Sequence, residues 1–193
     1  MAEIKSTMEK VMERLAAMDS AAGPDELLAD EKKKEGMRLA AAFLRGEEVN
    51  LTDGLAGQSE VVRKAQVAGQ VQAFLRNIVL PREEAQQKQA ERAMQGLLTV
   101  GHADAELVAV FGELKTVLDR YLAQRNQIRQ QLQDYFSQQL GQLQAKGGMG
   151  MKIRPEQHPK YQEEWQRAMG ELDNQYGRAL VQYKELVQKR LTM

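Results

Sequence analysis

The chain has 193 residues, with 27 basic and 27 acidic side chains, no cysteine and two histidines. The length suits one domain, or a domain with an extension. Without cysteine there are no disulfides, thiolate metal sites or cysteine nucleophiles, and two histidines leave almost no material for a zinc hydrolase centre or a Ser-His-Asp triad.

Charge and the apolar runs bear on where the protein acts. Residues 1–101 carry 14 basic and 16 acidic side chains, so they lack the clustered positive charge typical of nucleic-acid binding. Residues 1–8 do not resemble a secretory signal. The strongest apolar runs, 39–44 and 107–111, are far shorter than the roughly 20 residues that span a bilayer. We therefore expect a soluble, cytoplasmic protein with no nucleic-acid or membrane partner.

An N-terminal helical region is predicted over residues 1–101, with four shorter helices. The first covers residues 2–18, whose apolar side chains alternate at spacings of four and three residues, a heptad pattern. The second covers residues 24–45, because Pro24 suits the first position of a helix and Gly46 suits the position after its end. The heptad residues of the first helix are Ile4, Met8, Val11, Leu15 and Met18.

The third helix is predicted from about residue 59 to residue 79, and the fourth from Pro81 to Gly101. Gly69 lies one turn after Ala65, and small side chains at this spacing permit a close contact with another helix. Residues 30–36 of the second helix have no apolar stripe, so we expect the helix to be frayed there. The predicted apolar face of the third helix is Val61, Ala65, Ala68, Val71, Leu75 and Ile78.

A much longer helix is predicted from Ala103 to about Ala145, a stretch without proline. Its seam keeps heptad spacing, and at 1.5 Å per residue the helix would be roughly 65 Å long. A final helix with its own heptad pattern starts near Pro159. The seam of the long helix is Leu107, Phe111, Leu114, Leu118, Tyr121, Arg125, Ile128, Leu132, Tyr135 and Gln139.

Two heptad helices joined by a short loop should form an antiparallel coiled-coil hairpin, here over residues 102–193 with a tip loop at 146–158. A turn centred on Lys152 would place Leu132 opposite Leu172, and Arg125 opposite Ala179. The expected fold is therefore all-α, a helical bundle of about four shorter helices packed on the base of a long two-helix hairpin.

The two ends of this hairpin are expected to differ. Near the base, apolar residues surround most of the long helix, which is typical of a helix buried on several faces. Farther out, glutamines cover all but a narrow stripe, so residues 123–175 should project as an arm about 35 Å long. The apolar residues of the base are Val108, Ala109, Val110, Phe111, Val117 and Leu118.

The hairpin tip holds the candidate binding site. Three apolar side chains alternate there, and an extended strand would place them on one side. Flexible methionine side chains beside cations can form an adaptable docking surface. The glycines nearby do not have the spacing of a phosphate-binding loop, and the alternative to a docking site is a plain turn. The candidate partner-binding residues are Met149, Met151, Lys152, Ile153 and Arg154.

Catalysis is not expected, and we predict no catalytic residue, no metal and no cofactor. Neither His102 nor His158 follows a glutamate by three residues, as di-metal sites in helical bundles require. The sequence favours a non-enzymatic interaction or scaffold protein that presents the hairpin to a protein partner, with homodimerisation left open. The alternatives are a chaperone-like holder of protein clients and a peripheral membrane-associated hairpin protein.

Overall fold

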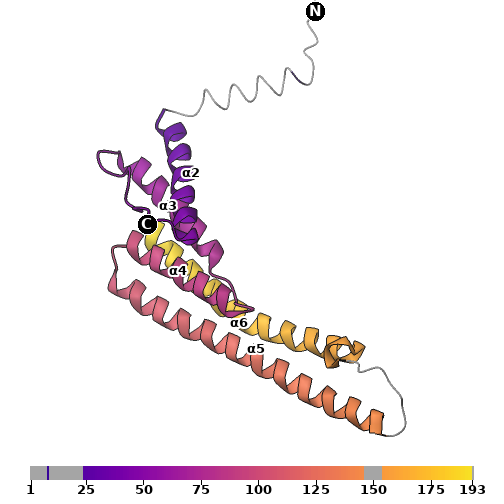
Figure 1. The fold of residues 1–193 in the computed structure, drawn as a ribbon. Coiled ribbons are helices and arrows are strands. Elements are labelled where there is room, and N and C mark those ends of the chain that lie inside the picture. The colour runs from indigo at the N-terminus through magenta and orange to yellow at the C-terminus, as the bar shows by residue number, and fades with distance from the viewer. Residues whose placement is uncertain (1–7, 9–23, 146–153, 193) are drawn as a thin grey trace, which may run out of the picture.

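The computed structural model describes residues 8, 24–145 and 154–192. Over these residues the protein is all-α, with no strand, and none of its helices is long and apolar enough to cross a membrane. Three shorter helices pack together, and two long antiparallel helices form a hairpin that extends past them (Figure 1). This arrangement confirms the predicted fold class. The helices are α2 (Pro24–Arg45), α3 (Glu60–Asn77), α4 (Glu84–Val100), α5 (Ala105–Ala145) and α6 (Pro159–Thr192), with the short 3-10 helix η1 (Pro155–Gln157) before α6.

Local signals set most ends of these helices, as predicted, but α4 begins at Glu84 and not at Pro81. Gly46 ends α2 with a φ of +95°, and its N–H donates to the carbonyl of Phe43 over 3.0 Å. The Ser59 hydroxyl caps α3 by accepting a hydrogen bond from the N–H of Val62. Gly101 closes α4 by donating to the carbonyl of Leu97. Apart from Met8, the first predicted helix at 2–18 lies outside the described residues.

One large hydrophobic core joins the three shorter helices to the base of the hairpin. It includes residues from both predicted regions, 1–101 and 102–193. Each large apolar side chain that becomes fully buried contributes about 1.5–3 kcal/mol relative to exposure. The most deeply buried large side chains of this core include Phe74, Ile78, Leu97, Leu107, Leu114 and Leu118.

The helices α2 and α3 cross at backbone contact distance. A Cβ atom at Gly36 would lie 2.1 Å from the carbonyl oxygen of Gln66, and one at Gly69 would lie 2.0 Å from that of Lys33. Glycine is therefore required on both helices, because it alone lets the two backbones approach this closely. The close contact predicted at Gly69 is confirmed. The crossing also explains why α2 is continuous through residues 30–36, where we expected fraying.

The buried face of α3 differs from the predicted apolar face. Val61 is 56% exposed, whereas Gln66 and Gln70 are fully buried. The Gln66 side-chain amide donates to the carbonyl of Asp53 over 2.7 Å, and that of Gln70 donates to Leu51 over 2.6 Å. These bonds offset part of the cost of burying the amides and hold the loop between α2 and α3 against the helix.

The hairpin seam departs from the predicted heptads at its distal end. Leu107 and Tyr121 are buried as expected, but Tyr135 is 55% exposed and Phe136 is buried instead. Gln139 is also exposed. A straight helix drifts about 20° per heptad, so over four heptads the residue that faces the partner helix moves on by one. α5 therefore follows the 3.6-residue period of a straight helix.

The register of the hairpin also differs from the prediction. Leu172 clusters with Tyr121 and not with Leu132. Arg125 lies beside Met169, with Nη1 3.2 Å from Sδ. Each pair places the turn nearer to the end of α5 than predicted, because the 3-10 helix η1 belongs to the returning limb of the hairpin. Cysteines placed at 132 and 172 are therefore not expected to cross-link.

The close crossing of α2 and α3 makes Gly69→Ala a destabilising substitution. The added methyl group would overlap the backbone of α2, and overpacking of this kind typically costs about 1–3 kcal/mol. The control is Gly170→Ala in α6, where nothing lies within 4 Å of the Cβ position. That change should raise stability by about 0.5–1 kcal/mol, since glycine disfavours helix. Urea unfolding followed by circular dichroism measures both, and equal stability of the two variants would contradict the backbone contact.

Candidate functional site

Most of the predicted tip site lies outside the described residues. Arg154 is described and exposed, and it directly precedes η1. Its backbone N–H donates to Oε1 of Gln157 over 3.3 Å. Arg154 is therefore the one residue of the predicted site that the structure describes, together with the helix ends that flank the tip. The predicted residues outside the description are Met149, Met151, Lys152 and Ile153.

An aromatic cluster joins the two helices just below the tip. The ring of Phe136 is 3% exposed and lies 5.7 Å from that of Tyr161, edge to face. The His158 ring lies 5.3 Å from Phe136 on another side. Aromatic pairs of this geometry contribute about 0.5–1.5 kcal/mol beyond the area they bury. Gln133 adds a hydrogen bond of 2.8 Å from its side-chain amide to Glu156 of η1, so polar and aromatic contacts both hold the distal end together.

A hollow of about 370 Å³, which we call the distal hollow, opens beside this cluster. Tyr135 stands at its edge, with its ring 5.2 Å from that of Phe136 in an edge-to-face contact. Its hydroxyl accepts a hydrogen bond of 2.7 Å from the Gln139 amide. An exposed aromatic side chain that is already held in place loses little conformational entropy on binding. The distal hollow is lined by Leu132, Tyr135, Phe136, Gln139, Lys160 and Glu164.

Halfway along the hairpin, Arg125 occupies the seam, but it lies against Trp165 and not opposite Ala179. Its guanidinium is 5.0 Å from the centre of the Trp165 ring, and that of Arg129 is 5.6 Å away. Cations over an indole ring are attracted by its quadrupole. Nε of Arg125 also donates to the carbonyl of Arg82 over 3.3 Å, so this side chain links the hairpin to the segment before α4.

Tyr121 marks the point where the arm leaves the core. It is 2% exposed, and its hydroxyl donates to Asp173 of α6 over 2.6 Å. Its ring packs edge to face on that of Tyr176, 5.5 Å away. Burial, and secondarily the hydrogen bond to Asp173, raise the pKa of Tyr121 to about 12. The neutral hydroxyl thus joins α5 to α6 at the root of the arm.

At the base of the hairpin, the sequence predicted that α5 is buried on several faces, but part of this apolar surface is exposed. Val108 is 50% exposed, Ala109 is exposed and Val110 is half-buried. α4 contacts α5 through an ion pair to Lys115 and a hydrogen bond to Asp119. At 100° per residue, these two positions lie on the far side of α5 from Val110. Among the described helices, α4 therefore leaves the flank that carries Ala109 and Val110 open.

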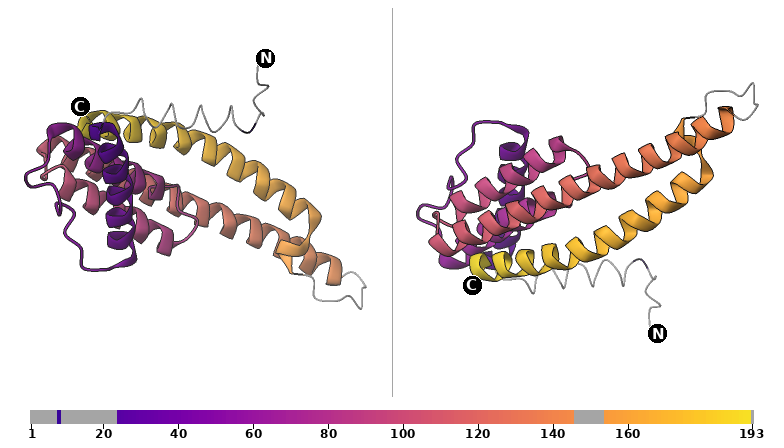
Figure 2. Two further views of the ribbon diagram at one scale, coloured as in Figure 1. Left: turned by 90° about the horizontal axis from the view of Figure 1, so that it is seen from above. Right: turned by 90° about the horizontal axis from the view of Figure 1, so that it is seen from below.

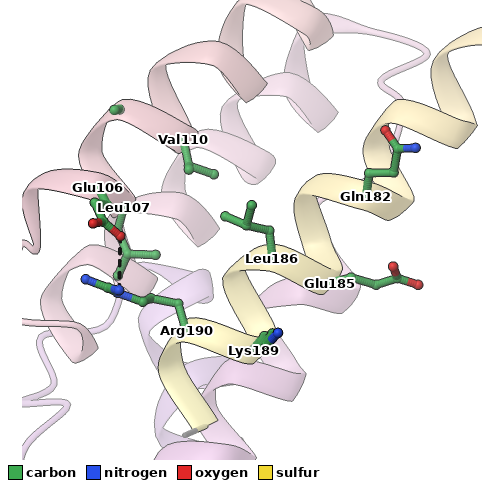
Figure 3. Close-up of a pocket in the computed structure, with 9 residues that line it drawn as sticks. Glu106, Leu107, Val110, Gln182, Glu185, Leu186, Lys189 and Arg190 are labelled. Atoms are coloured by element: carbon green, nitrogen blue, oxygen red, sulfur yellow. Dashed lines mark ion pairs between the residues drawn. The ribbon is translucent and has the colours of Figure 1, made fainter.

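This open flank forms an apolar groove of about 750 Å³ between α5 and α6, which we call the base groove (Figure 3). Val110 on α5 and Leu186 on α6 line it from opposite sides, and Leu186 is 52% exposed. Arg190 spans one end by pairing with Glu106 over 3.0 Å and with Asp104 over 3.0 Å. Sequence reasoning missed the groove. The signal for it was an apolar surface on α5 wider than the neighbouring helices cover.

The raised pKa of Tyr121 predicts how stability depends on alkaline pH. Because the pKa rises from 10.0 in the unfolded chain to about 12 in the folded protein, the contribution of this hydroxyl is complete below pH 10 and is lost as pH approaches 12. Tyr121→Phe should be less stable at neutral pH and should lose less stability over that alkaline range. Chemical unfolding at several pH values measures this. Parallel alkaline losses in the wild type and the variant would contradict the assignment.

Comparison with known proteins gives a family and no named relative. No curated protein and no solved structure shows a significant match to the chain. One family model matches residues 52–189, which contain α3, α4, α5 and most of α6, and so include the distal hollow and, apart from Arg190, the lining of the base groove. The match covers well over half of the chain, which therefore belongs to DUF6657, a family of unknown function.

Proposed function

We propose that this protein is a non-enzymatic interaction or scaffold protein of the cytoplasm, whose hairpin docks onto another protein. The observation that carries the proposal is the projecting arm (Figure 2). Between residues 123 and 142, α5 has one buried side chain, Phe136. Apart from the side that faces α6 and the contact of Arg125 with Arg82, the surface of this stretch is exposed and can meet a partner away from the bundle. The mechanism is docking of surfaces, without covalent chemistry.

The distal hollow is the contact that we propose for the arm. Binding energy in protein interfaces concentrates in a few residues, among which tyrosine is enriched, set in a surrounding that excludes water. Tyr135 has this character, since it is exposed and is held by Phe136 and Gln139. Lys160 and Glu164 provide one charge of each sign at the edge. These features suit a partner that inserts an apolar side chain flanked by polar groups.

The predicted tip residues are part of the same proposal. In the sequence, residues 149–154 fall between the segments of α5 and α6 that line the distal hollow. We therefore assign the tip and the distal hollow to one contact with the partner. The tip supplies methionines and cations, whereas the hollow supplies a fixed aromatic ring. Two variants separate these contributions.

Tyr135→Ala should weaken partner binding without unfolding the protein. Truncation of an aromatic anchor commonly costs about 2 kcal/mol or more, which is roughly a 30-fold loss in affinity. Capture from a lysate of the native host identifies the partner, and calorimetric titration of the purified partner then gives the affinity. Ser137→Ala is the control, because Ser137 is exposed on the same helix, two residues and so about 200° away from Tyr135.

A second variant replaces residues 149–154 with glycine and serine. Loss of binding in both variants would assign the contact to the whole distal end, and loss in the second alone would restrict it to the tip. A partner that binds both variants as tightly as the wild type would contradict docking through the arm.

A further inference from the structure

We propose that the base groove is the contact surface of a homodimer and that it is covered by the same face of a second copy of this chain. The groove lies at the opposite end of the hairpin from the distal hollow. The inference therefore stands independently of the docking function proposed for the arm.

Apolar side chains that line the groove are exposed to solvent. Leu186 projects towards Val110 across the groove, yet it is 52% exposed (Figure 3). Ala109 on α5, which also lines the groove, is exposed as well. Grouped apolar exposure with a polar rim is characteristic of surfaces that are covered in the working state of a protein. Pairing two hairpins through this flank would produce a four-helix arrangement with the apolar residues inside.

The pattern of charge on the groove selects a second copy of the chain as the occupant. Glu185 and Lys189 line the groove one turn apart on α6, and neither has an ion-pair partner among the described residues. Arg190 differs, since Glu106 and Asp104 already neutralise it within the chain. A two-fold axis passing between Glu185 and Lys189 makes α6 antiparallel to its copy. Each Glu185 then faces the Lys189 of the other chain.

This complementarity is supplied by symmetry. An unrelated partner would need its own apolar strip with a base and an acid in the reverse order at the same spacing. A second copy has all of these by construction, because a two-fold contact pairs each residue with its counterpart in exchanged roles. The neutral balance of the rim also avoids the repulsion that opposes self-association of a surface with one sign of charge.

Sedimentation equilibrium of the full chain tests the proposal. The wild type should sediment with twice the monomer mass of 21.8 kDa at high concentration and should dissociate on dilution. Leu186→Lys should sediment as a monomer at the same concentrations, because a charge would replace the central apolar contact. The matched control is Val61→Lys on α3, an equally exposed valine outside the groove, at 56% against 52%, which should stay dimeric. Circular dichroism confirms that both variants are folded.

A charge exchange tests the two-fold arrangement itself. Glu185→Lys places like charges opposite each other and should weaken the dimer about tenfold, an effect that added salt should reduce. Glu185→Lys combined with Lys189→Glu should restore the affinity, because each chain again carries one charge of each sign.

Three outcomes would overturn the proposal. The first is a wild type that is monomeric at every concentration. The second is equal weakening by Leu186→Lys and Val61→Lys, or a double charge exchange that restores nothing. The third concerns the N-terminal heptad segment: if Val11→Asp with Leu15→Asp dissociates the dimer while Leu186→Lys does not, self-association belongs to that segment and not to the base groove.

Discussion

The buried stripe at the base of α5 is the contact on which the rest of the structure depends. Leu107, Leu114 and Leu118 are each no more than 1% exposed and pack in one core with Val187 of α6. This stripe fixes both long helices to the bundle at one end. Because the helices continue past the bundle, the same contact also sets the direction of the arm.

The shorter helices provide the surface into which that stripe packs. α2 and α3 reach backbone contact at Gly36 and Gly69, so their relative position tolerates little change. Gln66 and Gln70 hold the intervening loop against α3 through its carbonyl groups. α4 then covers one side of α5 and leaves the other free. Among the described residues, the three short helices cover only part of the surface of α5, and the flank that they leave uncovered carries the base groove.

The helices and the hairpin could be predicted from the sequence because their signals are local. Pro24, Gly46 and Pro159 mark helix ends by their own backbone preferences, and the absence of proline between residues 103 and 145 allows one long helix. The details that failed are non-local. The burial of Gln66 depends on a carbonyl thirteen residues earlier in the chain, and heptad spacing cannot report whether α5 supercoils, so Tyr135 was predicted in place of Phe136. The register of the hairpin depends on how many residues the turn between α5 and α6 uses, which heptad spacing does not report. The distal hollow depends on this register and on which residue of α5 faces α6. At the base, the apolar pattern showed that α5 needs to be covered but not which side its neighbours reach.

α5 is one helix with two environments: it is anchored in a core near its start, and beyond the contact of Arg125 with Arg82 it extends away from the bundle. Hydrogen–deuterium exchange of the full chain measures this most directly, because backbone amides in a core exchange by global unfolding and those in a weakly packed segment exchange by local opening. The account predicts that amides between residues 107 and 122 exchange slowest, and that those between 123 and 142 exchange markedly faster. Equally slow exchange along the whole of α5 would contradict the account, because the distal helix would then belong to the same cooperative core as the base.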